Sequence, residues 1–116
     1  MEFVNEQHQQ DYERLRRWQA RRKDDIYFDS ALYVLAAVGK KQISQYIDED
    51  GIHFPDLIKV AAPWSTSEKG MIHLAWELFN GGPSENKWGV HDIFGRLEEP
   101  WCYVALKAIQ KRYHIS

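Results

Sequence analysis

A run of basic residues near the N-terminus is the segment of this 116-residue chain best suited to specific chemistry. Six arginines and lysines, and no acidic residue, fall between positions 14 and 23. On a helix, Arg14, Arg17 and Arg21 recur at spacings of three and four and share one face, with Trp18 beside them. Guanidinium groups bind phosphates and carboxylates through paired hydrogen bonds, and an indole ring adds a stacking surface. The segment therefore predicts a site for an acidic group, carried by either a protein or a nucleic acid.

The charge of the rest of the chain bears on which partner is favoured. The chain has 15 basic and 17 acidic residues and a formal charge of -2. Setting aside the six basic residues leaves nine basic residues against seventeen acidic ones, a formal charge of -8. A strongly acidic remainder repels a polyanion, so an acidic protein surface is the favoured partner and nucleic acid the alternative. A further alternative is that the arginines pair within the fold, with Asp11, Glu13, Asp24, Asp25 or other acids.

Aromatic residues are unusually frequent, at 14% of the chain with five tryptophans. Aromatic side chains fill cores and also anchor protein interfaces, so the surplus suits either role. Trp64 follows a helix-breaking proline, and Trp88 lies in the loop-like stretch 81–90, where an exposed ring would be available to a partner. The partner-binding residues predicted from the sequence are Arg14, Arg17, Trp18, Arg21, Arg22, Trp64 and Trp88.

The sequence shows no arrangement of catalytic or metal-binding residues. Its five histidines have neither HxxxH nor HxH spacing. Cys102 lies close behind two glutamates that disfavour a thiolate, and Ser65 is already used in a capping box with Glu68. We therefore expect no catalytic residue, no metal and no cofactor, and we do not expect an enzyme. The alternative is a small enzyme in which folding brings a histidine and a carboxylate together.

The elements that would position these residues are helices, because the hydrophobic period is helical through most of the chain. The segment 26–38 is apolar almost all round, which is typical of a central, buried helix. Residues 52–54 suit an extended conformation but are too short and isolated to predict a sheet. We predict a single all-α domain of five to seven helices spanning residues 1–116, with helices over 5–23, 26–38, 40–48, 55–62, 66–80, 91–97 and from 100 onward.

Composition also indicates where the protein works. No apolar run reaches the ~18–20 residues that span a bilayer, and the opening MEFVNEQH is too polar for a signal peptide. The single cysteine excludes an internal disulfide framework and a cysteine-based zinc cluster. We expect a soluble cytoplasmic protein with no membrane partner.

Four segments, in this order, resemble a known group of sequences: EFVNEQH at 2–8, ALYVLA at 31–36, LAWELFNG at 74–81 and ALKAIQKRY at 105–113. They resemble an uncharacterised family of small all-α proteins from Firmicute bacteria, their phages and other mobile elements. The family has no assigned activity, so the resemblance carries over no functional residue. The arginine-rich segment and the stretch 81–90 depart from the family pattern, and a specialised role would lie there.

The resemblance implies a mode of action by analogy. Small phage-borne proteins without catalytic motifs often act stoichiometrically, for instance by blocking a host defence nuclease. We therefore expect a non-catalytic protein-binding module, in its most specific form a phage or mobile-element anti-defence inhibitor that binds an acidic surface of a host protein. The alternative is a nucleic-acid-binding protein that uses the arginine-rich first helix.

Overall fold

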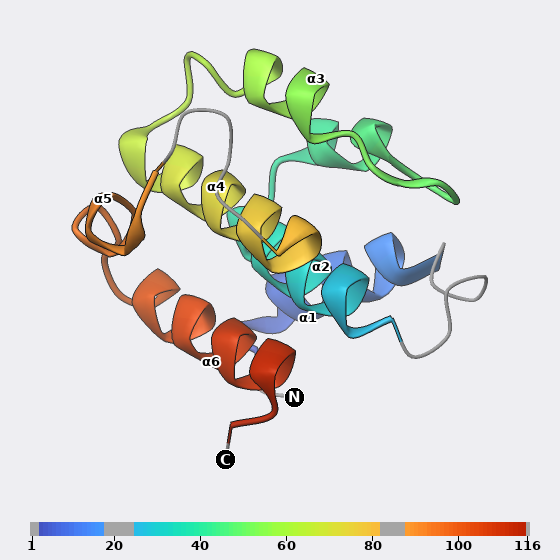
Figure 1. Ribbon diagram of the computed structural model, residues 1–116. Coiled ribbons are helices and arrows are strands. Elements are labelled where there is room, and N and C mark those ends of the chain that lie inside the picture. Colours follow the sequence, from blue (N-terminus) through green and yellow to red (C-terminus); the bar gives the residue numbers. More distant parts are fainter. Residues whose placement is uncertain (1–2, 18–24, 82–87, 116) are drawn as a thin grey trace.

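The computed structural model describes residues 3–17, 25–81 and 88–115, and these residues form an all-α fold (Figure 1). Within them the elements are α1 (Glu6–Leu15), α2 (Ile26–Val38), η2 (Lys41–Tyr46, a 3-10 helix), β1 (Ile47–Asp48), β2 (Gly51–Ile52), α3 (Phe54–Val60), α4 (Thr66–Asn80), α5 (Val90–Phe94) and α6 (Trp101–Tyr113). The predicted fold class is confirmed, and the helices of the described residues fall within the predicted range of five to seven.

The central element is α2, which packs against α4, α6 and α1. Figure 1 shows α2 between α4 above and α6 below. Phe28, Leu32 and Leu35 are almost completely buried, and nearly every other residue of the helix is buried as well. A helix that is apolar on all sides is stable in water only when other elements cover every side. The sequence pattern of residues 26–38 therefore predicts the central position of α2.

The sequence predicts N-caps at Asn5 and Ser65 and helix stops at Gly39 and Gly81, and the structure confirms them; it also shows a cap at Asp25, where the sequence predicts only a turn. Asn5, Asp25 and Ser65 each accept a backbone N–H three residues further on, at the starts of α1, α2 and α4. Gly39 and Gly81 end α2 and α4 with φ of 73° and 75°, a left-handed conformation that glycine adopts without strain.

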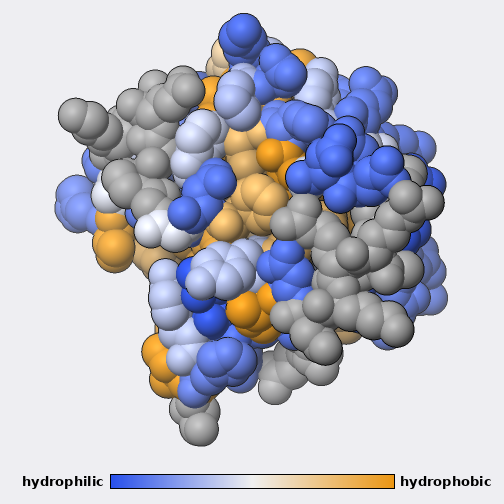
Figure 2. All heavy atoms as spheres, turned by 45° about the vertical axis from the view of Figure 1, so that its right-hand side comes forward, coloured by the Kyte–Doolittle hydropathy of each residue, from blue (hydrophilic) through white to orange (hydrophobic). Residues whose placement is uncertain are grey.

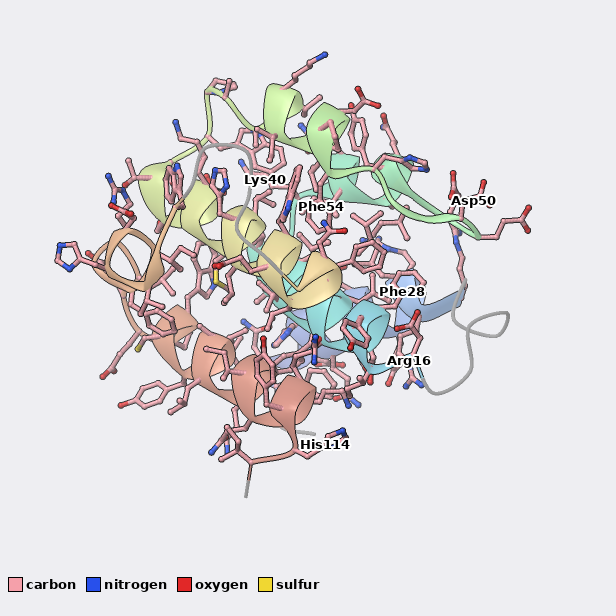
Figure 3. All side chains as sticks on the ribbon, viewed as in Figure 1. Arg16, Phe28, Lys40, Asp50, Phe54 and His114 are labelled. Carbon is pink, nitrogen blue, oxygen red and sulfur yellow. The ribbon has the colours of Figure 1, made fainter. Side chains whose placement is uncertain are left out.

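The segment after η2 forms a minimal strand pair that is too short to be predicted from the sequence. The predicted helix over 40–48 ends at Tyr46, and β1 then pairs antiparallel with β2, with Ile47 opposite Ile52. The Asp48 carboxylate accepts the backbone N–H of Asp50 at 2.8 Å, which closes the turn between the strands. Figure 3 shows Asp50 at the tip of this hairpin, and the burial of both isoleucines holds its base against the core.

The first helix also differs from its predicted extent of 5–23. The α-helix ends at Leu15, the last buried residue of its inner stripe, and Arg16 and Arg17 form a tighter 3-10 turn. The Arg16 N–H is shared between the carbonyls of Tyr12 and Arg14. The regular α-helical hydrogen-bond pattern therefore ends here. Positions 16–17 carry no apolar residue to extend the buried stripe, so the predicted α-helix does not continue through Arg17; its predicted end at residue 23 lies outside the described residues.

The remaining helices follow the prediction more closely. Pro55 occupies the first turn of α3, which ends two residues early, and α5 is shorter than the predicted 91–97. The inner face of α6 is built from Val104, Ala105 and Ala108, as the spacing predicts, and a cis Glu99–Pro100 peptide bond precedes this helix.

One face of the molecule mixes polar and apolar character. Figure 2 shows hydrophobic side chains in the middle of that face with hydrophilic ones around them. Among the described residues, no helix has the length and apolar character needed to cross a membrane.

Candidate partner-binding face

The structure separates the predicted partner-binding residues. Arg14 is half-exposed and forms an ion pair with buried Asp11, the Arg14 Nη2 to Asp11 Oδ1 distance being 3.0 Å. Arg14 therefore follows the alternative of pairing within the fold. Arg17 lies exposed in the turn after α1. Trp18, Arg21 and Arg22 lie outside the described residues.

The other two predicted anchors, Trp64 and Trp88, lie beside α4: Trp64 directly precedes its N-cap, and Trp88 stacks on His73 of this helix. Both rings are partly buried against the core rather than fully exposed. The Lys40 ammonium lies 5.3 Å from the Trp64 ring centre, and the Trp88 ring stacks on the buried His73 ring with 4.3 Å between their centres. The structure does not bring these tryptophans together with the arginines.

Two polar contacts on the Asp29 carboxylate join α1, α2 and α6. The Tyr12 hydroxyl on α1 donates to the Asp29 carboxylate on α2, and Lys111 Nζ on α6 lies 2.7 Å from the other carboxylate oxygen. Burial and the bond to Asp29 raise the pKa of Tyr12, so its hydroxyl keeps its proton. Arg16 lies over the Tyr12 ring, 5.2 Å from its centre. These contacts hold basic side chains of α1 and α6 around one buried carboxylate.

A second basic group, the guanidinium of Arg112, is fixed by contacts of its own. Arg112 of α6 donates from Nε to the Leu78 carbonyl at 3.0 Å. Its guanidinium carbon lies 3.6 Å from the ring centre of Tyr27 and 4.7 Å from that of Tyr113. Both tyrosines are about half exposed, at 45% and 53%. The guanidinium is thus held in one place between two accessible rings, which is the cation–π arrangement that arginine favours.

We group six residues under the name basic–aromatic face, five of them through the contacts above and Arg17 because it follows Arg16 in the same exposed turn: Arg16, Arg17, Tyr27, Lys111, Arg112 and Tyr113. Figure 3 shows Arg16 at the end of α1 and His114 just after α6, both in the lower half of the molecule. The face can bind a carboxylate or phosphate through guanidinium groups and stack a planar group on tyrosine.

Sequence reasoning identified only one residue of this face, Arg17, as a binding residue. In the sequence, Lys111 and Arg112 are typical of the C-terminal end of a helix, where positive charge complements the helix dipole. The sequence around Tyr27 does not indicate a binding role, because only the packing of α6 against α2 brings Tyr27 under Arg112. At this face, the adjacent Arg112 and Tyr113 are the sequence feature that brings a cation next to a ring.

One histidine is paired with a carboxylate, as the enzyme alternative requires. The His53 Nε2 to Asp48 Oδ2 distance is 2.8 Å, and this contact lowers the pKa of Asp48. Both side chains are nearly half exposed on the outside of the hairpin, where the ion pair bridges its two sides. In the part of the chain that the structure describes, no group of three or more His, Cys, Asp or Glu residues is placed to hold a metal ion.

Comparison of the chain with family models, with curated proteins and with solved structures gives no match. The described residues define an all-α protein that carries a basic–aromatic face. The function proposed below for the protein is based on that face.

Proposed function

We propose that the chain is a non-catalytic, cytoplasmic protein-binding module whose basic–aromatic face binds an acidic surface of a partner protein. The proposal rests above all on Arg112, whose guanidinium is held between the half-exposed rings of Tyr27 and Tyr113. Arginine and tyrosine are among the residues that contribute most to binding energy in protein interfaces. A guanidinium already fixed in place loses little conformational entropy on binding, so more of its interaction energy appears as affinity.

Electrostatics supports an acidic partner. Arg16, Arg17, Lys111 and Arg112 all carry positive charge at this face, while the chain as a whole is slightly acidic. The Asp29 carboxylate beneath this face is buried and accepts from Tyr12 and Lys111. Such a concentration of one charge on a near-neutral molecule guides an oppositely charged surface to that face.

Capture from a bacterial lysate tests the proposal. Tagged protein is incubated with nuclease-treated lysate over a salt series, and retained proteins are identified by mass spectrometry. Arg17→Glu and Tyr27→Ala alter the face, while Lys59→Glu and Tyr103→Ala make the same chemical changes on exposed residues elsewhere. We expect one protein to be retained by the wild type and both controls and lost with both face variants. Equal retention by all variants would contradict this placement of the site.

A second candidate function, nucleic-acid binding, is favoured by the same guanidinium and tyrosine geometry. Phosphates bind guanidinium groups, and unpaired bases stack on tyrosine rings. This alternative predicts retained material that nuclease removes and whose affinity falls steeply with salt, because phosphate contacts release counterions. Protein retained after nuclease and at moderate salt contradicts it.

The most specific form of the proposal is a mobile-element anti-defence inhibitor that acts stoichiometrically on a host protein. Its support is the sequence resemblance described above, together with a face built for binding. An inhibitor of this kind reduces the activity of the captured host protein in proportion to the amount added and completely at equimolar concentration. If an amount of the chain far below equimolar abolished the activity of the host protein, the chain would be an enzyme instead.

A further inference from the structure

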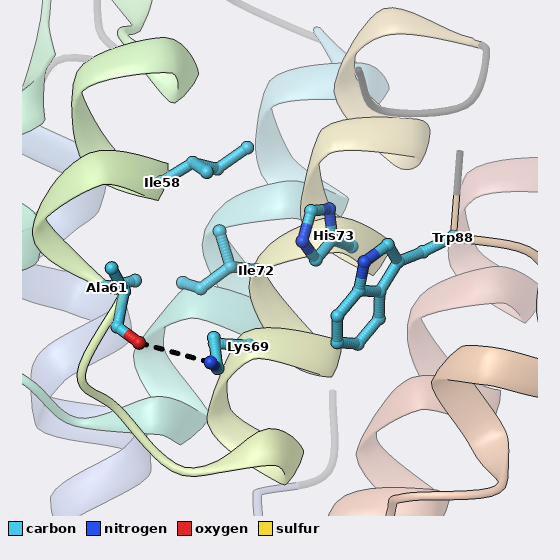
Figure 4. A pocket seen from close by; sticks show the side chains of 7 residues that line it. Ile58, Ala61, Lys69, Ile72, His73 and Trp88 are labelled. Atoms are coloured by element: carbon cyan, nitrogen blue, oxygen red, sulfur yellow. Dashed lines mark hydrogen bonds between the residues drawn. The ribbon is translucent and has the colours of Figure 1, made fainter. Parts of the chain in front are cut away.

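A pocket lies between α3 and α4, away from the basic–aromatic face. Its volume is about 220 Å³, and it is lined by Ile58, Ala61, Ala62, Lys69, Ile72, His73 and Trp88. Figure 4 shows Ile58 of α3 and Ile72 of α4 beside the pocket, with Trp88 next to His73 at its side. Most of these side chains are hydrocarbon or aromatic, so the pocket favours an apolar ligand body.

The aromatic wall of the pocket is fixed on both sides. The Trp88 and His73 rings stack with 4.3 Å between centres and an angle of 18° between planes. The guanidinium of Arg96 lies 4.8 Å from the Trp88 ring centre. Because His73 is buried on α4 and supports the indole, the wall is already in place before a ligand arrives.

Lys69 brings a positive charge to this pocket, whose lining surface is nearly as polar as it is apolar. Its ammonium donates one hydrogen bond, to the Ala62 carbonyl at 3.1 Å (Figure 4). No carboxylate among the described residues forms an ion pair with it, since the nearby Glu68 pairs with Lys40 at 3.4 Å. An ammonium has three donors, so two remain for a ligand. Burial and the nearby Lys69 lower the pKa of His73, which leaves Lys69 as the cation of the pocket at neutral pH.

We propose that this pocket binds a small monocarboxylate with a ring or short hydrocarbon tail, its carboxylate on Lys69 and its apolar body against Trp88, Ile58 and Ile72. The volume limits the size of the ligand. A pocket of about 220 Å³ exceeds the ~150 Å³ cavity that holds benzene but is smaller than the ~300–1,000 Å³ of sites for drug-sized molecules. Benzoate and hexanoate are of the right size and charge.

Titration of the labelled protein with benzoate, followed by amide and indole N–H chemical shifts, tests the proposal. We expect saturable shifts at Lys69, Ile72, His73 and the Trp88 indole, and the same pattern with hexanoate. Lys69→Met keeps the length of the side chain but removes its charge, and should weaken benzoate binding about tenfold or more. Lys59→Met makes the same change on an exposed lysine outside the pocket and should leave binding unchanged.

Two further comparisons make the test decisive. Ala62 is exposed at the pocket, so Ala62→Leu should fill it and abolish the shifts without disturbing the core. Benzamide has nearly the same shape as benzoate but no charge, and should bind much more weakly. Equal affinity for benzamide and benzoate, unchanged benzoate binding by Lys69→Met, or no shift at the pocket residues would each overturn the proposal. The lysate capture through the basic–aromatic face is independent of every one of these results.

Discussion

At the scale of single residues, His8 attaches the beginning of the chain to the central helix. The backbone N–H of Val4 donates to its Nδ1 at 3.2 Å, and its Nε2 lies 2.9 Å from the Tyr33 carbonyl. Because Nδ1 accepts a hydrogen bond and the carbonyl can only accept, the neutral ring carries its proton on Nε2. Phe3 packs edge-on against the ring, and His8 is 2% exposed. Protonation of Nδ1 would break the bond from Val4 and place a charge in the core.

This geometry predicts that acid weakens the fold as the pH falls through the range in which histidines of the unfolded chain take up protons. Burial is the main cause that lowers the pKa of His8 and of His73 below 6.5 in the folded state. The unfolded chain therefore takes up these protons first, and the free energy of unfolding falls as pH drops below about 6.5. Chemical denaturation at pH 7 and pH 5 measures the change.

The variant His8→Gln should have a lower free energy of unfolding than wild type at pH 7, because glutamine replaces the two hydrogen bonds imperfectly. Between pH 7 and pH 5, however, its free energy of unfolding should fall less than that of wild type. His114→Gln, at an exposed site, should keep the wild-type slope. If His8→Gln retained the full wild-type slope, the buried neutral His8 would not be the source of the acid sensitivity.

At the scale of elements, α4 has the most completely specified start in the fold. The Ser65 hydroxyl accepts the Glu68 N–H at 3.2 Å, and the Glu68 carboxylate accepts the Ser65 N–H at 3.0 Å. These reciprocal bonds satisfy two N–H groups at the helix start that have no backbone partner within the helix. Glu68 also accepts the ion pair from Lys40, so the cap links α4 to the chain after α2.

Removing the cap should cost stability at this one site. Ser65→Ala should lower the free energy of unfolding by about 1 kcal/mol, within the range of ~0.5–2 kcal/mol found for N-caps. Thr66→Ala, at the exposed next position, should change it by only a few tenths, because alanine is the better helix former there. Thermal or urea unfolding of both variants measures the difference, and an equal loss in the two would show that the hydroxyl of Ser65 does not act as a cap.

Elements with local signals were predictable, and those defined by tertiary contacts were not. The starts at Asn5 and Ser65 and the stop at Gly39 depend on side chains or backbone within four residues of the helix end. The strand pair at 47–48 and 51–52 is too short to show a period of two, so its pairing had no pattern to reveal it. The end of α1 depends on where core contact stops, which the continuing charged residues did not indicate.

The candidate site divides in the same way. Basic residues near α1 could be predicted from the sequence because they lie within ten positions of one another, and Arg17 is exposed directly after Arg16. The partnership of Tyr27 with Arg112 spans 85 positions of the chain and depends on α6 lying along α2, which no short-range pattern encodes. The pairing of Arg14 with Asp11 was among the alternatives, but only the structure shows that it occurs.

At the scale of the whole molecule, α2 is shared by every other large helix. Its buried residues face α1, α4 and α6 at once, and no second core is separate from it in the part of the chain described. The radius of gyration is 12.8 Å, close to the ~13 Å of a folded domain of this length. A shared central helix couples its neighbours, since none of them can leave without exposing apolar surface of α2.

The predicted single domain should therefore unfold as one cooperative unit. In urea, far-UV circular dichroism and tryptophan fluorescence should give coincident transitions, because both report loss of the same core. Leu32→Ala, at a side chain with no exposed surface, should lower the free energy of unfolding by about 2–5 kcal/mol and shift both transitions together. Leu106→Ala, at a half-exposed leucine of α6, should change it far less, by about 0.5 kcal/mol. Two separated transitions, or a Leu32→Ala variant that shifts one signal and leaves the other in place, would show that the chain holds two independent folding units and that α2 does not join them.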